Sequence, residues 1–216
     1  MTVEHHYAHC YSYFPLSETE VDLALSIDGL GDNTNVLALD LPTRRVLAKR
    51  DLAESLNCTM SWVLNDIGVS NMGWDSHHLD WAGKLMGLQG YGNDMVIRLT
   101  RASLMDLPVV TKGREFTRRP QPGHELSSHW PSGQGQELRD FLYSYHKQYT
   151  ANLVDFMGSL FERDARNYYA GGVALNVVVN DVLREHFPSI VINAHCADEN
   201  LSFGLVEMAR RFSVSA

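Results

Sequence analysis

Two histidines near the start of the chain, His5 and His9, have a spacing that suits metal binding. Residues four apart lie on one face of an α-helix, which brings both imidazoles within reach of a single ion. His6 lies on a different face of such a helix, where substrate contact or simple polarity is expected. The spacing alone leaves open a histidine cluster without function, or a remnant of tag-like sequence.

Asp28 is the next residue with a side chain suited to such a site. The apolar run before it predicts a buried strand, and Gly29 and Gly31 after it predict a turn. A carboxylate at a strand end can bind a metal or position a water, while the glycines let backbone N–H groups approach phosphate oxygens. An ordinary Asp-Gly turn without a ligand explains the same residues equally simply.

Two further features lie near the C-terminus. Gly171 and Gly172 follow an expected strand and open an expected helix that includes Asn176. Backbone donors at a helix N-terminus favour an anion, and the missing side chains would let an adenosine lie against the chain. A tight turn without a ligand is the alternative. Asp198 either caps the last helix or completes a metal site.

The remaining sequence predicts an α/β protein that positions these residues. An antiparallel meander of three strands is expected over 21–28, 34–39 and 46–49, with further strands over 168–170 and 190–193. Helices are expected over 55–69, 136–163, 173–185 and 200–211, with a break of the second near Gly158 as an alternative. Residues 70–135, rich in Gly, Pro, Asn and His, predict loops with a short helix over 81–88 and a strand over 95–100.

Composition restricts the class of protein. The three cysteines are odd in number and lack C-x-x-C spacing, which indicates a reducing compartment and predicts a cytoplasmic protein. The sequence contains no apolar run long enough to span a membrane, and its N-terminus is unlike a secretory signal. The net charge of -8 argues against general polyanion binding. The basic segment with Lys112, Arg114, Arg118 and Arg119 is expected to be a solvated loop, with contact to a phosphate as the alternative.

Together, these residues belong to five motifs that resemble the O-carbamoyltransferases of antibiotic and nodulation-factor biosynthesis. The catalytic domain of that family is related to the tRNA threonylcarbamoylation protein. The motifs are His-His-x-Ala-His, Asp-Gly-x-Gly after a strand, Gly-Lys-x-Met-Gly-Leu-x-x-Tyr-Gly, Gly-Gly-Val-Ala-Leu-Asn, and an Asp before the final helix. They match residues 5–9, 28–31, 83–92, 171–176 and 198, in the family's order and over nearly the whole chain.

The resemblance implies an actin-like, ribonuclease-H-like nucleotide-binding fold (ASKHA), present in part, with a mixed sheet flanked by helices. Residues 1–216 would form the metal- and ATP-binding core, and residues 70–135 a loop-rich insertion that binds the acceptor. One divalent metal is expected on His5, His9, Asp28 and Asp198. Iron is the first choice, with zinc or manganese as alternatives, because two imidazoles and two carboxylates suit all three.

The resemblance also implies the reaction. In the family, carbamoyl phosphate is converted to carbamate at a separate domain, carbamate and ATP give carbamoyl-adenylate, and the carbamoyl group passes to a substrate hydroxyl. Asp28 with Gly29 and Gly31 would hold the phosphate, and Gly171, Gly172 and Asn176 the adenosine.

Two residues are candidates for further roles in that reaction. An acceptor hydroxyl needs a base within hydrogen-bond reach, for which His6 is the candidate. Lys84 could bind an anionic intermediate, with a solvated lysine as the alternative.

The sequence departs from the family at both ends. The lobe that precedes the His-His-x-Ala-His run and the carbamoyl-phosphate domain that follows the final helix have no counterpart here. We therefore expect a partner chain that supplies them, or a homodimer, since exposed strand edges favour association. Near Lys84 the family has an acidic pair where this chain has residues 79–82, so residues 70–135 are expected to select the acceptor.

Three functions compete at this stage. The first is carbamoyl transfer to a small molecule, a sugar or a hydroxymethylated nucleobase, with nucleic acid as an acceptor supported only by the basic segment. The second is a non-catalytic nucleotide- and metal-binding subunit of a split carbamoyltransferase. The third is a metal-dependent hydrolase, which is disfavoured because no Glu lies between His5 and His9 to act as general base.

Overall fold

The computed structural model describes residues 4–13, 20–31, 34–50, 83, 86–95, 111–112, 115–116 and 135–213. The chain divides into two compact units, one of residues 1–51 with 154–216 and one of residues 52–153. The helix predicted over 55–69, Lys84 and all but the first residue of the strand predicted over 95–100 lie outside the described residues.

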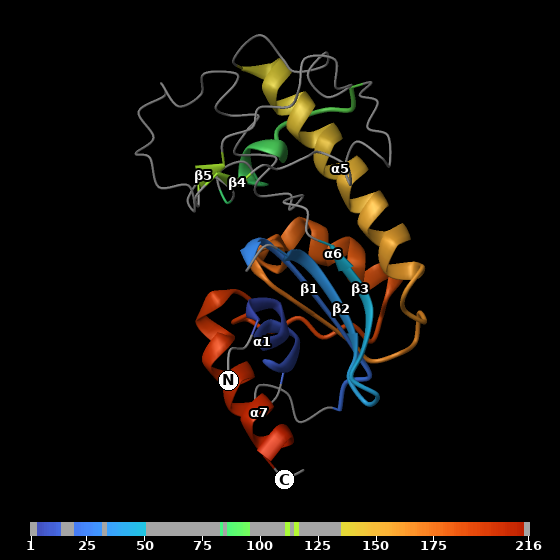
Figure 1. Cartoon of the computed structure of the whole chain (residues 1–216). Coiled ribbons are helices and arrows are strands. Elements are labelled where there is room, and N and C mark those ends of the chain that lie inside the picture. The colour runs from blue at the N-terminus through green and yellow to red at the C-terminus, as the bar shows by residue number, and fades with distance from the viewer. Residues whose placement is uncertain are drawn as a thin grey trace. The chain divides into compact units, whose positions relative to one another are not determined.

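The first unit is built on a mixed four-stranded sheet in the order β3-β2-β1-β6 (Figure 1). Its strands are β1 (Leu23–Gly31), β2 (Thr34–Asp40), β3 (Arg45–Arg50) and β6 (Asn167–Ala170). The first three form the predicted antiparallel meander, while β6 pairs with β1 in parallel. β1 is an inner strand whose residues 24–27 are all buried, so apolar residues stand at the consecutive positions 23–25 instead of alternating with polar ones.

Two helices cover one face of this sheet. They are α1 (His5–Tyr11) and α7 (Leu201–Ser213), which pack against each other beside the strands (Figure 1). Residues two apart on a strand share a face, and Ala24, Leu37, Leu39, Tyr168 and Ala170 form one hydrophobic core with residues of these helices. The same alternation places Ser26 and Asp28 on the face that α1 covers.

Gly204 allows the close approach of α1 and α7. A Cβ atom at this position would collide with the backbone carbonyl of Ala8, so only glycine fits while the two helices keep their contact. The pair of helices therefore depends on a residue that the sequence did not single out.

β1 differs from its prediction. A turn was expected at Gly29 and Gly31, but the strand continues to Gly31, with an irregular register against β2 between Ile27 and Gly31. Glycine suits such a bulge because it lacks a side chain that must pack. Asp28 therefore lies within a strand, three residues before its end.

Two predictions near Gly172 also need correction. Residues 172–175 form a 3-10 turn, η2, and the helix α6 (Val177–His186) starts only after Asn176, whose backbone is extended. The Asn176 side chain accepts hydrogen bonds from the N–H groups of Val178 and Val179, which makes it the N-cap of α6. The strand predicted over 190–193 is reduced to a single bridge between Val191 and Tyr168.

The second unit contains most of α5 (Gln136–Gly158), the long amphipathic helix predicted from its apolar spacing. It ends at Gly158, the position of the alternative break, and does not continue to residue 163. Residues 86–89 are helical, as predicted, and the segment after them is held to α5 by hydrogen bonds such as that from the Asn93 N–H to Asp140. Part of the expected basic loop is instead a short hairpin of β4 (Thr111–Lys112) and β5 (Glu115–Phe116).

The buried His146 of α5 predicts acid sensitivity. Its side chain is 3% exposed, and its Nδ1–H donates to the carbonyl of Leu142 at 3.0 Å. Burial lowers the pKa of His146 to about 4, against about 6.5 in an unfolded chain. Between these values the unfolded state binds more protons, so the free energy of unfolding should fall by about 3 kcal/mol as the pH drops from 6.5 to 4.

Urea unfolding at several pH values measures this effect against the variant His146→Asn, whose neutral amide can also donate to Leu142. The wild type should lose about 3 kcal/mol more than the variant over this pH range. Parallel pH profiles for the two proteins would exclude His146 as the cause.

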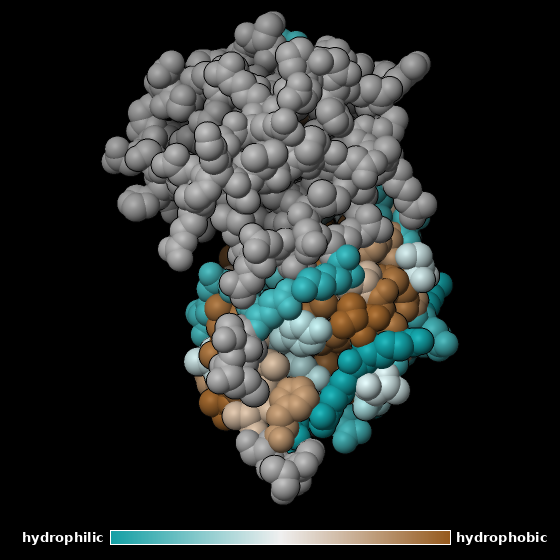
Figure 2. Space-filling view, in the orientation of Figure 1, coloured by the Kyte–Doolittle hydropathy of each residue, from teal (hydrophilic) through white to brown (hydrophobic). Residues whose placement is uncertain are grey.

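The surface of the first unit mixes hydrophilic and hydrophobic residues (Figure 2). Large exposed hydrophobic side chains include Val46 of β3 and Phe203 and Val206 of α7. Within the described residues, no helix combines the length and hydrophobicity that a membrane span requires.

Candidate metal centre

His5 and His9 face the same side of α1, as their spacing predicts. The Nε2 atoms of the two imidazoles lie 3.0 Å apart, and the rings meet edge to face with centroids 4.6 Å apart. The helical conformation of residues 5–11 thus confirms the geometric premise of the first prediction.

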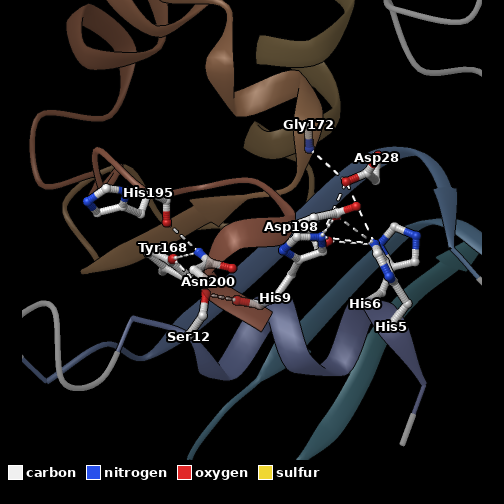
Figure 3. Close-up of polar contacts among 11 residues, drawn as sticks. His5, His6, His9, Ser12, Asp28, Tyr168, Gly172, His195, Asp198 and Asn200 are labelled. Carbon is white, nitrogen blue, oxygen red and sulfur yellow. Dashed lines mark hydrogen bonds and ion pairs between the residues drawn. The ribbon is translucent and has the colours of Figure 1, made fainter. Parts of the chain in front are cut away.

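Two carboxylates from distant parts of the chain meet these imidazoles (Figure 3). Asp28 comes from β1, and its Oδ2 lies 3.2 Å from His9 Nε2 and 3.8 Å from His5 Nε2. Asp198 comes from η3 (Asp198–Asn200), the turn before α7, and its Oδ1 lies 3.4 Å and 3.3 Å from the same two atoms. The structure therefore brings together all four predicted metal ligands, one atom from each lying within 4.8 Å of the others.

These separations fit a single ion. Metal bonds to imidazole nitrogen and carboxylate oxygen are about 2.0–2.2 Å long, so neighbouring ligand atoms around one ion lie roughly 3.0–3.6 Å apart. Four of the five separations given above, from 3.0 to 3.4 Å, lie within this range, and the fifth, between His5 Nε2 and Asp28 Oδ2, is 3.8 Å. The donor set suits Fe(II), Zn or Mn and does not choose among them.

The centre is buried on one side and open on the other. The side chain of His9 is fully buried, those of His5 and Asp28 are largely buried, and that of Asp198 is 71% exposed. Structural zinc sites are closed by four protein ligands, whereas catalytic metals keep a position for water or substrate. Solvent therefore reaches the centre on the Asp198 side.

The imidazoles and carboxylates of the centre shift one another's pKa values. Hydrogen bonds to Asp198 and Asp28 raise the pKa of His5 to about 10. Burial opposes the upward shift in the pKa of His9, but the same carboxylates outweigh it. The pKa of Asp28 falls in spite of its burial, and that of Asp198 falls too, because both imidazoles hydrogen-bond to them. Two converging carboxylates need a neighbouring positive charge, which protons supply here and a divalent cation would replace.

Gly172 supports the centre in a way that the sequence did not predict. Its N–H donates to Asp28 Oδ2 at 2.8 Å, the same oxygen that faces the imidazoles. Gly171, with a φ of 92°, makes this possible, since a Cβ there would collide with the Ile27 backbone. The Gly-Gly motif thus orients a metal ligand, as hydrogen bonds to ligating carboxylates commonly do.

Two of the other residues predicted to bind a nucleotide, Gly171 and Asn176, already have partners within the chain. The N–H of Gly171 donates to the carbonyl of Cys196 at 2.6 Å, and Oδ1 of Asn176 is occupied by its role as helix N-cap. Gly29 and Gly31, which were also predicted to bind the nucleotide, lie in β1 directly after Asp28 and at the end of the strand.

His6, the predicted general base, is not among the four clustered side chains. It is fully buried, and its Nδ1 lies 2.7 Å from the hydroxyl oxygen of Ser26, which is buried as well. The ring centroid of His6 lies 5.5 Å from that of His5 and 6.2 Å from that of His9.

A scan against protein-family models and a search of curated proteins found no match to this chain. Function must therefore be inferred from the geometry of the centre and from the motifs that supply its ligands.

Proposed function

We propose that this chain is the metal-binding core of an O-carbamoyltransferase, with an actin-like fold present in part. The observation that carries the proposal is the convergence of His5, His9, Asp28 and Asp198. These ligands come from three of the five motifs that resemble that family, and they are far apart in the sequence. Chance similarity of short motifs would give no reason for their side chains to meet.

The topology of the first unit supports the fold. An antiparallel meander of three strands followed by a parallel fourth strand is consistent with a ribonuclease-H-like sheet. Asp198 directly before the last helix and Asp28 near the end of β1 are further support for the resemblance.

The chain's own residues can bind and orient a divalent cation. Bound there, the cation would supply Lewis-acid chemistry, withdrawing charge from a phosphate or carbonyl oxygen. Gly172 holds Asp28, and the buried His9 fixes the inner side of the centre. The exposed side of Asp198 leaves an approach for the donor and the acceptor hydroxyl.

ATP and carbamoyl phosphate enter this proposal through the motifs alone. A partner chain that supplies a carbamate-producing domain, or a second copy of this chain, belongs to the same proposal. The acceptor would be a small molecule, a sugar or a hydroxymethylated nucleobase.

Mass spectrometry tests the reaction. The purified chain, alone and with the products of neighbouring genes, would be incubated with metal, ATP, carbamoyl phosphate and a panel of alcohols, sugars and hydroxymethylated nucleosides. We expect an acceptor heavier by one carbamoyl group, and only when ATP is present.

The variant His9→Ala separates the enzyme from a non-catalytic subunit. The catalytic proposal predicts that metal and carbamoyl transfer are lost together. An assembled complex that still carbamoylates its acceptor after His9→Ala has removed the metal would show that the chemistry lies in another chain.

A further inference from the structure

We infer that His6 is a positioning residue of the metal centre, which acts through its hydrogen bond to Ser26 and not by proton transfer. The bond holds α1 on β1 at the place where His5 and His9 face Asp28. This inference rests on the metal centre of the proposed function, but not on carbamoyl transfer.

The two bonded residues are neighbours of the ligands. His6 follows His5 directly, and Ser26 precedes Asp28 by two positions, so the Ser26 and Asp28 side chains share one face of β1. The 2.7 Å contact between His6 Nδ1 and Ser26 Oγ therefore joins the same helix and strand that the metal ligands join. Both side chains have no exposed surface, which strengthens the bond and makes it costly to break.

The faces of α1 explain why His6 and not a ligand makes this contact. His6 and Cys10 are four residues apart and turn toward the sheet, where the Cys10 thiol donates to the carbonyl of Leu37 on β2. His5 and His9 lie on the adjacent face and turn toward Asp28 and Asp198 (Figure 3). One face of α1 thus fixes the helix while the next presents the ligands.

α1 needs such attachments because it is short. A helix of seven residues has little stability of its own, so its position depends on tertiary contacts. Its C-terminal end is held by Ser12, whose hydroxyl lies 2.9 Å from that of Tyr168 on β6. Its N-terminal end carries His5, and the His6–Ser26 bond attaches that end to β1.

The burial of His6 argues against proton transfer. The centre opens to solvent on the Asp198 side, whereas His6 lies between α1 and the sheet. An acceptor hydroxyl arriving from the open side would meet Asp198 and His5 and not the His6 ring.

Titration with Co²⁺, followed by its visible absorption, tests this role in the full chain. We expect Ser26→Ala and His6→Ala each to raise the dissociation constant about tenfold, the lower end of the effect seen when a residue that orients a ligand is removed. The double variant should bind Co²⁺ no more weakly than the weaker-binding of the two single variants, because both changes remove the same hydrogen bond. The Co²⁺ absorption should also change in shape, which a loss of global stability alone would not produce.

His6→Asn provides the rescue, because its amide can take the place of Nδ1 beside Ser26. It should restore most of the affinity that His6→Ala loses. Asn167→Ala is the matched control. Asn167 is fully buried, as His6 is, and its side chain donates a hydrogen bond to the backbone carbonyl of Glu162. It lies at the end of β6 that is remote from the centre. This variant should bind Co²⁺ like the wild type.

Ser26→Ala removes a single oxygen atom, so it carries the test if the His6 variants do not fold. Ser26→Ala with wild-type affinity and spectrum would overturn the inference while leaving the metal centre intact. A wild-type chain that binds no Co²⁺ would instead overturn the metal centre itself, and this inference with it.

Discussion

Asp28→Asn is expected to weaken the binding of a divalent cation by more than about 100-fold, since loss of even an outer partner of a metal ligand costs 10–100-fold. The substitution removes the negative charge of the side chain and keeps its size and shape. The asparagine oxygen can still accept the Gly172 N–H, so the Gly-Gly turn keeps its contact. What is lost is one of the two carboxylates that lie 3.2 and 3.4 Å from the buried His9 Nε2.

Competition with a chromophoric chelator measures this affinity. Asp181→Asn on α6 makes the same chemical change at an exposed position outside the cluster, and it should bind the cation like the wild type. Equal affinity for Asp28→Asn and Asp181→Asn would remove Asp28 from the set of ligands.

Gly204→Ala is expected to lower the free energy of unfolding by about 2 kcal/mol or more, in the range for overpacked sites. Alanine favours a helix over glycine by about 1 kcal/mol, so intrinsic propensity predicts the opposite sign. The steric effect should win because the new Cβ would meet the backbone of Ala8, which cannot rotate away as a side chain can. α1 would have to move away from α7.

That movement should also damage the metal centre. α1 carries His5 and His9, and Asp198 lies directly before α7, so separating the helices separates the ligands. Thermal unfolding and chelator competition on the same samples would follow both effects. Gly158→Ala at the end of α5 is the control, since a Cβ there has nothing within 4 Å, and it should be neutral or stabilising. A Gly204→Ala protein as stable as that control would contradict the close packing of α1 on α7.

The features that the sequence predicted well are those that depend on neighbouring residues. The spacing of His5 and His9 is a local property of one helix, and the meander follows from three apolar segments separated by turn residues. Asn176 carried a local signal as well, because asparagine is a preferred N-cap, yet the apolar residues before it suggested a longer helix.

Contacts between residues far apart in the sequence could not be predicted from local patterns. The bond from Gly172 to Asp28 joins residues 144 positions apart, and nothing but the order of the motifs suggested pairing them. The same is true of Gly204, which looks like an ordinary helix interior until the carbonyl of Ala8 is seen beside it. Ser26 was part of an apolar strand in the sequence, and only the structure shows it bonded to His6.

The direct test of the central claim is the metal content of the chain, measured by inductively coupled plasma mass spectrometry. The protein would be purified without oxygen, supplied with Fe²⁺ and freed of loosely bound ions, alongside a His5→Ala, His9→Ala double variant. A centre formed by His5, His9, Asp28 and Asp198 predicts close to one ion per wild-type chain and almost none in the variant. A wild-type chain that retains no metal, or a variant that retains as much as the wild type, would contradict it.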